Sequence, residues 1–80
     1  MYTKSELAFV RSMLAGDSCQ QAQSNVARLG LPALTEQTLA VWQNIYLPVL
    51  RENRFYAASV ASGTMSMSDV ITSINKRMKG

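Results

Sequence analysis

Catalysis requires titratable or nucleophilic side chains at close spacing, and this chain of 80 residues offers few of them. It contains no histidine and one cysteine, Cys19, which excludes the Ser–His and Cys–His nucleophile pairs. Glu6 and Asp17 are the nearest of its five carboxylates along the sequence, and more than two helical turns separate them. No local acid–base pair is visible, and the four glycines form no phosphate-binding loop. We therefore expect no enzymatic activity and no small-molecule substrate.

Metal and cofactor sites are not expected either. One thiol without any imidazole is too small a ligand set for a zinc site. We interpret Cys19 as a reduced, buried apolar side chain, because its neighbours would not activate the thiol. The apolar run from Leu7 to Val10 is too short for a signal peptide, and no stretch approaches a membrane span of about 20 apolar residues. The sequence predicts a cytoplasmic protein that does not engage a membrane.

Positive charge gathers in the last part of the chain. Eight Lys and Arg against five Asp and Glu give a net charge of +3. Basic and acidic residues cancel over residues 1–50, so the whole excess lies in residues 51–80. Three cations of the last helical turn are candidate anion contacts: Lys76, Arg77 and Lys79. Cations at a helix C-terminus also stabilise the helix dipole, so this cluster has an explanation that needs no partner.

Aromatic and arginine side chains cluster in the middle of the chain. Such side chains are enriched in protein interfaces, and so small a domain cannot easily bury all its rings. We predict a partner-binding surface made of Trp42, Tyr46, Arg51, Arg54, Phe55 and Tyr56. The competing interpretation places Trp42, and one of Phe55 and Tyr56, in the core.

The elements that must position these side chains are helices. Apolar residues recur every three or four positions behind capping residues, and no long alternation predicts a strand. The pattern predicts helices over residues 3–15, 18–29, 35–46, 48–61 and from 68 onward, capped by Thr3, Asp17, Thr35 and Ser68. Pro48 should kink the third helix or begin a new one, and so present the partner-binding surface. The expected fold is a single all-α domain over residues 1–80, a bundle of four or five short antiparallel helices.

The same spacing predicts which faces are buried. Leu7, Val10 and Leu14 recur on one face of the first helix, with Phe9 and Met13 alongside. The inward residues expected of the later helices are Cys19, Ala22, Val26, Leu29, Leu39, Trp42, Ile45, Tyr46, Val49, Tyr56, Val60, Val70, Ile71, Ile74 and Met78.

One segment loosely resembles a helix-turn-helix motif. It comprises the run from Ala15 to Ser18, the run from Ala27 to Gly30, and Thr35. The resemblance covers about a quarter of the chain and implies a DNA-binding regulator whose third helix enters the major groove. The segment from residue 18 to 30 is about one turn longer than in the motif.

The charge of the third helix is a poor match to DNA. Residues 35–50 contain no Lys or Arg, whereas phosphate contacts supply most non-specific affinity. The side chains of this helix that could form hydrogen bonds to base edges are uncharged, namely Gln37, Thr38, Gln43 and Asn44.

We therefore expect a non-enzymatic interaction module that acts as an inhibitor, adaptor or accessory regulator. It would bind a protein partner, a second copy of itself as a homodimer, or both. Chain length alone favours a bacterial or phage accessory protein. The alternative is a small DNA-binding transcriptional regulator that uses the second and third helices.

Overall fold

The computed structural model describes the backbone of residues 2–79 and the side chains of residues 2–77, and every regular element in that range is helical. Its α-helices are α1 (Lys4–Leu14), α2 (Cys19–Arg28), α3 (Glu36–Val41), α4 (Leu47–Glu52), α5 (Ala57–Ala61) and α6 (Met67–Lys79). A π-helical turn, Trp42–Tyr46, joins α3 to α4, and a 3-10 turn, Arg54–Tyr56, precedes α5. The predicted small all-α bundle is confirmed.

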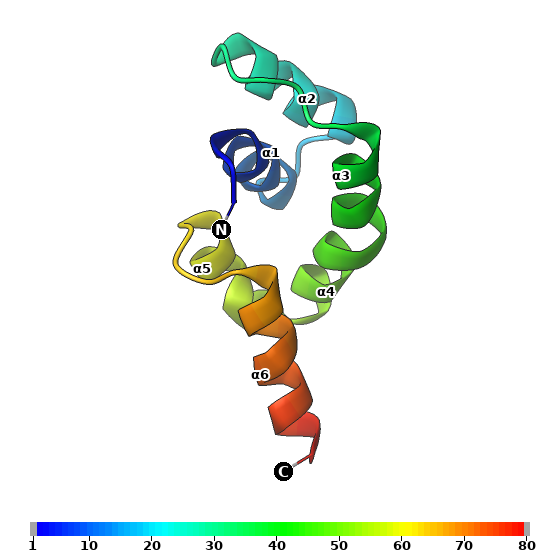
Figure 1. Ribbon diagram of the computed structural model, residues 1–80, viewed down its shortest axis with the longest axis vertical. Coiled ribbons are helices and arrows are strands. Elements are labelled where there is room, and N and C mark those ends of the chain that lie inside the picture. Colours follow the sequence, from blue (N-terminus) through cyan, green and yellow to red (C-terminus); the bar gives the residue numbers. More distant parts are fainter. Residues whose placement is uncertain (1, 80) are drawn as a thin grey trace.

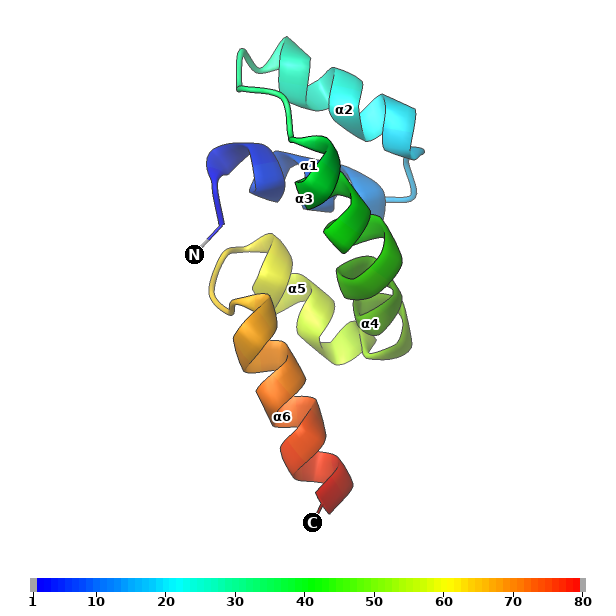
Figure 2. The same cartoon turned by 45° about the vertical axis from the view of Figure 1, so that its right-hand side comes forward.

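Helices α1 to α5 pack together into one body, and α6 extends away from it. In Figure 1, α1 lies at the centre, α2 covers it on one side, and α3 with α4 forms a continuous rod beside it. The rod and α5 close the remaining sides, and α6 points away from the body (Figures 1 and 2). The molecule is accordingly elongated, with extents of 44 × 22 × 21 Å.

Side-chain caps fix where the helices begin. Thr3 caps α1 as predicted, with its Oγ1 accepting from the Glu6 amide at 3.1 Å. The α2 cap is Ser18 rather than Asp17, because the Asp17 carboxylate accepts a hydrogen bond from Ser12 instead. At α6 the cap predicted at Ser68 is also wrong. Ser66 Oγ accepts from the Asp69 amide at 3.2 Å, while Asp69 Oδ2 accepts from the Ser66 amide at 3.4 Å, a reciprocal arrangement that starts the helix at Met67.

The helix boundary expected near Pro48 is present, since α4 begins at Leu47, but a π turn keeps α3 and α4 continuous. The Leu47 amide donates to the Trp42 carbonyl five residues back, which is the hydrogen bond of a π turn. The additional residue in this turn places Pro48 in the first turn of α4, where its missing N–H costs little. The helix predicted over residues 48–61 is instead two helices separated at Asn53, whose φ of −125° and ψ of 63° are not helical.

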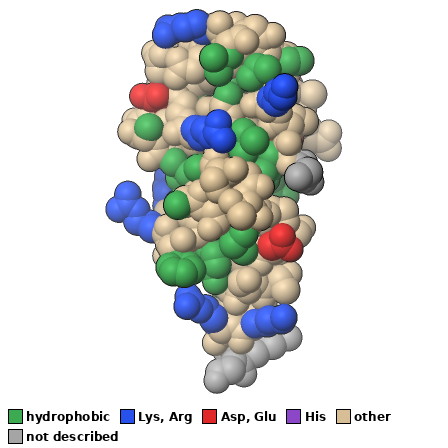
Figure 3. All heavy atoms as spheres, turned by 90° about the vertical axis from the view of Figure 1, so that its left-hand side faces the viewer, with side chains coloured by type: hydrophobic (Ala, Val, Ile, Leu, Met, Phe, Trp, Pro, Cys, Tyr) green, Lys and Arg blue, Asp and Glu red, His purple; other side chains and the backbone are tan. Residues whose placement is uncertain are grey.

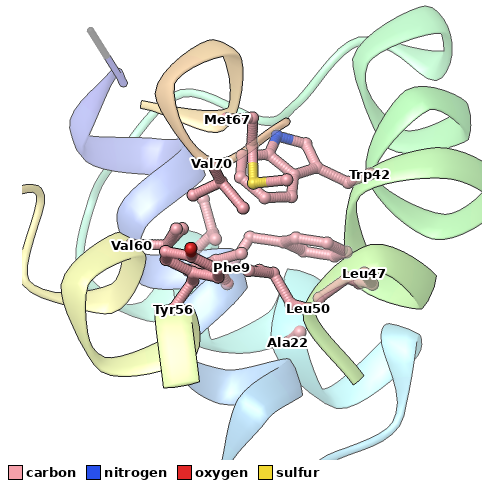
Figure 4. Close-up of a cluster of buried hydrophobic side chains, with 11 residues drawn as sticks. Phe9, Ala22, Trp42, Leu47, Leu50, Tyr56, Val60, Met67 and Val70 are labelled. Carbon is pink, nitrogen blue, oxygen red and sulfur yellow. The ribbon is translucent and has the colours of Figure 1, made fainter. Parts of the chain in front are cut away.

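Most of the helices and turns contribute at least one buried side chain to the core. Figure 4 shows Phe9 beneath the indole of Trp42, with Met67 lying across that ring and Val70 beside it. Tyr2 and Tyr46 pack on the same indole at centroid distances of 5.5 and 5.0 Å. Two residues expected in the core are exposed. Leu29 lies beyond the last residue of α2, and the π turn changes the helical phase so that Ile45 faces outward.

Candidate interaction surface

The described residues contain no clustered set of metal-ligand side chains. Within residues 2–77 no three His, Cys, Asp or Glu side chains gather closely enough to hold a metal ion. Among the described helices, none has the length and apolar character needed to cross a bilayer. Among the hollows on the described surface, two have volumes of ≈ 320 Å³, lined by the start of α1 and residues 31–35, and ≈ 450 Å³, lined by α1 and the end of α2.

The structure divides the predicted partner-binding residues between core and surface. Trp42 and Tyr56 are 1% and 7% exposed, so both rings belong to the core and no partner can reach them. Tyr46 is half-buried against Trp42. The remaining three, Arg51, Arg54 and Phe55, are exposed.

Phe55 is the most exposed large apolar residue of the described chain. Its side chain is 78% exposed, because the 3-10 turn has three residues per turn and sends Phe55 outward as it turns Tyr56 inward. The Phe55 ring meets the Tyr56 ring edge-on at 5.3 Å, and the Arg77 guanidinium lies 5.7 Å from its centroid. This cation–π contact links the 3-10 turn before α5 to the projecting part of α6.

A groove between α4 and α6 exposes further apolar side chains near Arg77. It has a volume of ≈ 190 Å³ and is lined by Val49, Glu52, Asn53, Ile71, Ile74 and Asn75. Ile74 lies one turn before Arg77 on α6, so these two side chains are neighbours on the helix surface. We call Phe55, Val49, Ile71, Ile74 and Arg77 together the α6 surface.

Figure 3 shows one side of the molecule with its long axis vertical. Hydrophobic side chains reach the solvent in groups along this face, and Lys or Arg side chains flank the group near the C-terminal end of α6. Such groups of exposed apolar atoms are commonly contact sites on small proteins.

Arg51 and Arg54 lie on a different surface from the Phe55 ring. They line a hollow of ≈ 290 Å³ between the end of α1 and the α4–α5 segment, together with Gly16 and Asp17. The sequence could not show this separation, because Arg54 and Phe55 are adjacent in the chain and diverge only through the 3-10 turn.

The predicted anion contacts are only partly described. Lys76 is exposed on α6, and Arg77 is exposed but stacked on Phe55. The side chain of Lys79 lies outside the described residues, as does that of Met78.

The surroundings of α3 do not resemble a DNA-reading surface. Residues 29–35 connect α2 to α3, which is longer than the three- or four-residue turn of the motif. One hollow beside α3 is lined by Gln37, Thr38, Val41, Trp42 and Tyr46, and Glu6 is the charged residue in its lining; a second, at the start of α3, is lined by both Lys4 and Glu6. A carboxylate at this position repels phosphate, which weighs against α3 as a recognition helix.

Sequence reasoning missed the isoleucines of α6 as surface residues. Ile71 and Ile74 were expected to be buried; both are half-buried beside the groove, and Ile74 packs against the core.

Comparisons of this chain with protein-family models, with curated proteins and with solved structures found no significant match. The function is therefore argued from the surface itself.

Proposed function

We propose that this protein is a non-enzymatic interaction module that binds a protein partner through the α6 surface. The observation that carries the proposal is the exposed Phe55 ring, held by Arg77 next to the half-buried isoleucines of α6. An aromatic ring fixed in solvent loses little further conformational freedom on binding, and its burial is favourable.

The proposed role is that of a small inhibitor, adaptor or accessory regulator that occupies or bridges surfaces. We place this action in the cytoplasm, where a free thiol such as Cys19 stays reduced. The scarcity of clustered titratable groups in the described residues supports binding rather than catalysis.

Site-specific photocrosslinking tests the proposal. Phe55 is replaced by a photoreactive phenylalanine in cells of the source organism, and the same replacement at Leu29 is the matched control. Leu29 is 66% exposed but lies at the end of α2, away from the α6 surface. We expect a discrete covalent adduct with a protein from position 55 and none from position 29.

Two results would contradict this proposal. One is equal or absent crosslinking from the two positions. The other is salt-sensitive binding to duplex DNA that is unchanged by Phe55→Ser, which would favour the DNA-binding alternative.

A further inference from the structure

The hollow between α1 and α2 differs from the other hollows in the charge of its lining. It has a volume of ≈ 450 Å³ and is lined by Ala8, Arg11, Ser12, Asn25, Arg28 and Leu29. The groove and the other hollows described above each have Glu6, Asp17 or Glu52 in their lining, whereas this lining contains two arginines and no carboxylate. A guanidinium binds carboxylate and phosphate groups through paired N–H donors. The hollow therefore suits an anion that its own lining does not supply.

Helical spacing brings the lining residues together from two elements. Each helix contributes three of them, at positions i, i+3 and i+4, and the residue at i+3 is an arginine in both cases. Because α2 covers α1 on one side (Figures 1 and 2), the two sets meet across the helix contact.

Hydrogen bonds within the fold hold this hollow in shape. Asn25 Nδ2 donates to Ser12 Oγ at 2.9 Å, which links the two helices at the hollow. Arg11 Nε donates to the Ala61 carbonyl at 2.7 Å, which fixes that side chain and uses one of its N–H donors. Side chains that are already held lose less conformational freedom when a ligand binds.

The lining also contains apolar surface next to the positive charge. Leu29 is 66% exposed and Ala8 is half-buried. An inorganic anion would leave these side chains in water, whereas an aliphatic chain would cover them, and that burial is favourable. The volume of the hollow lies within the range of about 300–1,000 Å³ that small-molecule sites occupy.

We propose that this hollow binds a small monocarboxylate with an aliphatic chain. The carboxylate contacts the arginine side chains, and the aliphatic chain covers Ala8 and Leu29. The hollow lies on α1 and α2, away from the α6 surface, so the inference goes beyond the proposed function and does not rest on it.

Titration of the purified full chain with sodium hexanoate at constant ionic strength, followed by amide correlation NMR spectra, tests the inference. We expect saturable shifts of the backbone amide signals of Ala8, Asn25 and Leu29, with a Kd of about 1 mM, as suits a ligand of so few atoms. Hexanamide has the same chain without the charge, and its shifts should not saturate below about 20 mM.

Arg28→Gln should weaken hexanoate binding at least about tenfold, because it removes a charge-assisted hydrogen bond. Arg28 is exposed, so this variant should keep the wild-type circular dichroism spectrum. Arg54→Gln is the matched control, because it removes the same charge from the hollow that contains Asp17. It should bind hexanoate within about twofold of the wild type.

Three results would overturn the inference. The first is the absence of saturable shifts with hexanoate, and the second is equal weakening by Arg28→Gln and Arg54→Gln. The third is inorganic phosphate binding as tightly as hexanoate, which would show that Ala8 and Leu29 contribute nothing and that the arginines serve a phosphate group.

Discussion

At the residue scale, Tyr2 combines a partly buried ring with a buried hydroxyl that lacks a hydrogen-bond partner. Its ring packs on Trp42 at 5.5 Å, and its buried hydroxyl faces the Met67 backbone without forming a well-aligned hydrogen bond. Burial raises the pKa of Tyr2 to about 12, with a smaller contribution from the Glu6 carboxylate. An unsatisfied buried hydroxyl destabilises the folded state.

We predict that Tyr2→Phe raises the free energy of unfolding by about 1 kcal/mol at neutral pH. The unfolded chain loses the tyrosine proton near pH 10, whereas the folded chain keeps it to about pH 12. The wild type should therefore lose stability relative to Tyr2→Phe as the pH rises through this interval. Urea unfolding of both proteins at about pH 8 and pH 11 measures the difference. A gap that narrows at alkaline pH would contradict the assignment.

Trp42 and Phe55 show how far residue type alone predicts a site. Both are aromatic residues of the same sequence region, and both residue types are enriched in protein interfaces. The structure seals Trp42 in the core and leaves Phe55 78% exposed. Composition indicates that some rings must remain outside, but packing decides which ones.

At the element scale, a polar link joins α1 to α2 inside an otherwise apolar contact. Ser12 Oγ donates to Asp17 Oδ2 at 2.6 Å and accepts from Asn25 Nδ2 at 2.9 Å. Ser12 is only 7% exposed and Asn25 is half-buried, so loss of the hydroxyl removes a hydrogen bond from Asn25 in a poorly solvated place, whereas the exposed Asp17 can be rehydrated.

We predict that Ser12→Ala lowers the free energy of unfolding by about 1–3 kcal/mol. Ser24→Ala on the exposed side of α2 is the control, and it should change stability by less than about 0.5 kcal/mol. Urea titration followed by circular dichroism gives both values. Equal effects of the two substitutions would mean that the Ser12 link contributes nothing.

The α3–α4 rod shows what element prediction left unspecified. The expectation was a kink at Pro48 or a new helix beginning there, because proline obstructs a regular α-helix, and α4 does begin at Leu47. The chain also forms a π turn over Trp42–Tyr46. Because Trp42 at the beginning of that turn and Leu47 after it are both buried, long-range packing favours the continuous rod.

At the scale of the whole molecule, α6 has two functionally different parts. Its first turn supplies Met67 and Val70 to the core over Trp42, and its second half projects into solvent (Figures 2 and 4). A small core of this kind supplies only about 3–5 kcal/mol, so damage at the base of α6 should affect the entire fold.

We predict that Val70→Asp unfolds the protein at room temperature, because an unpaired carboxylate at a 0% exposed site costs several kcal/mol. The fluorescence of Trp42, the only tryptophan, should shift to longer wavelength as water reaches the ring. Thr72→Asp, on the exposed side of the same helix, should retain the native spectrum. A native emission maximum for Val70→Asp would show that α6 is not anchored through Val70.

The sequence by itself determined the features that depend on neighbours within about four residues. Helical periodicity, the Thr3 cap and the scarcity of clustered titratable groups can all be seen in it, because helix hydrogen bonds and caps are local. Tertiary structure alone decided which rings are buried, how the chain passes Pro48, and that Arg54 and Phe55 face different surfaces. Each of these outcomes depends on contacts between residues far apart in the chain, and their free energies outweigh the local preferences.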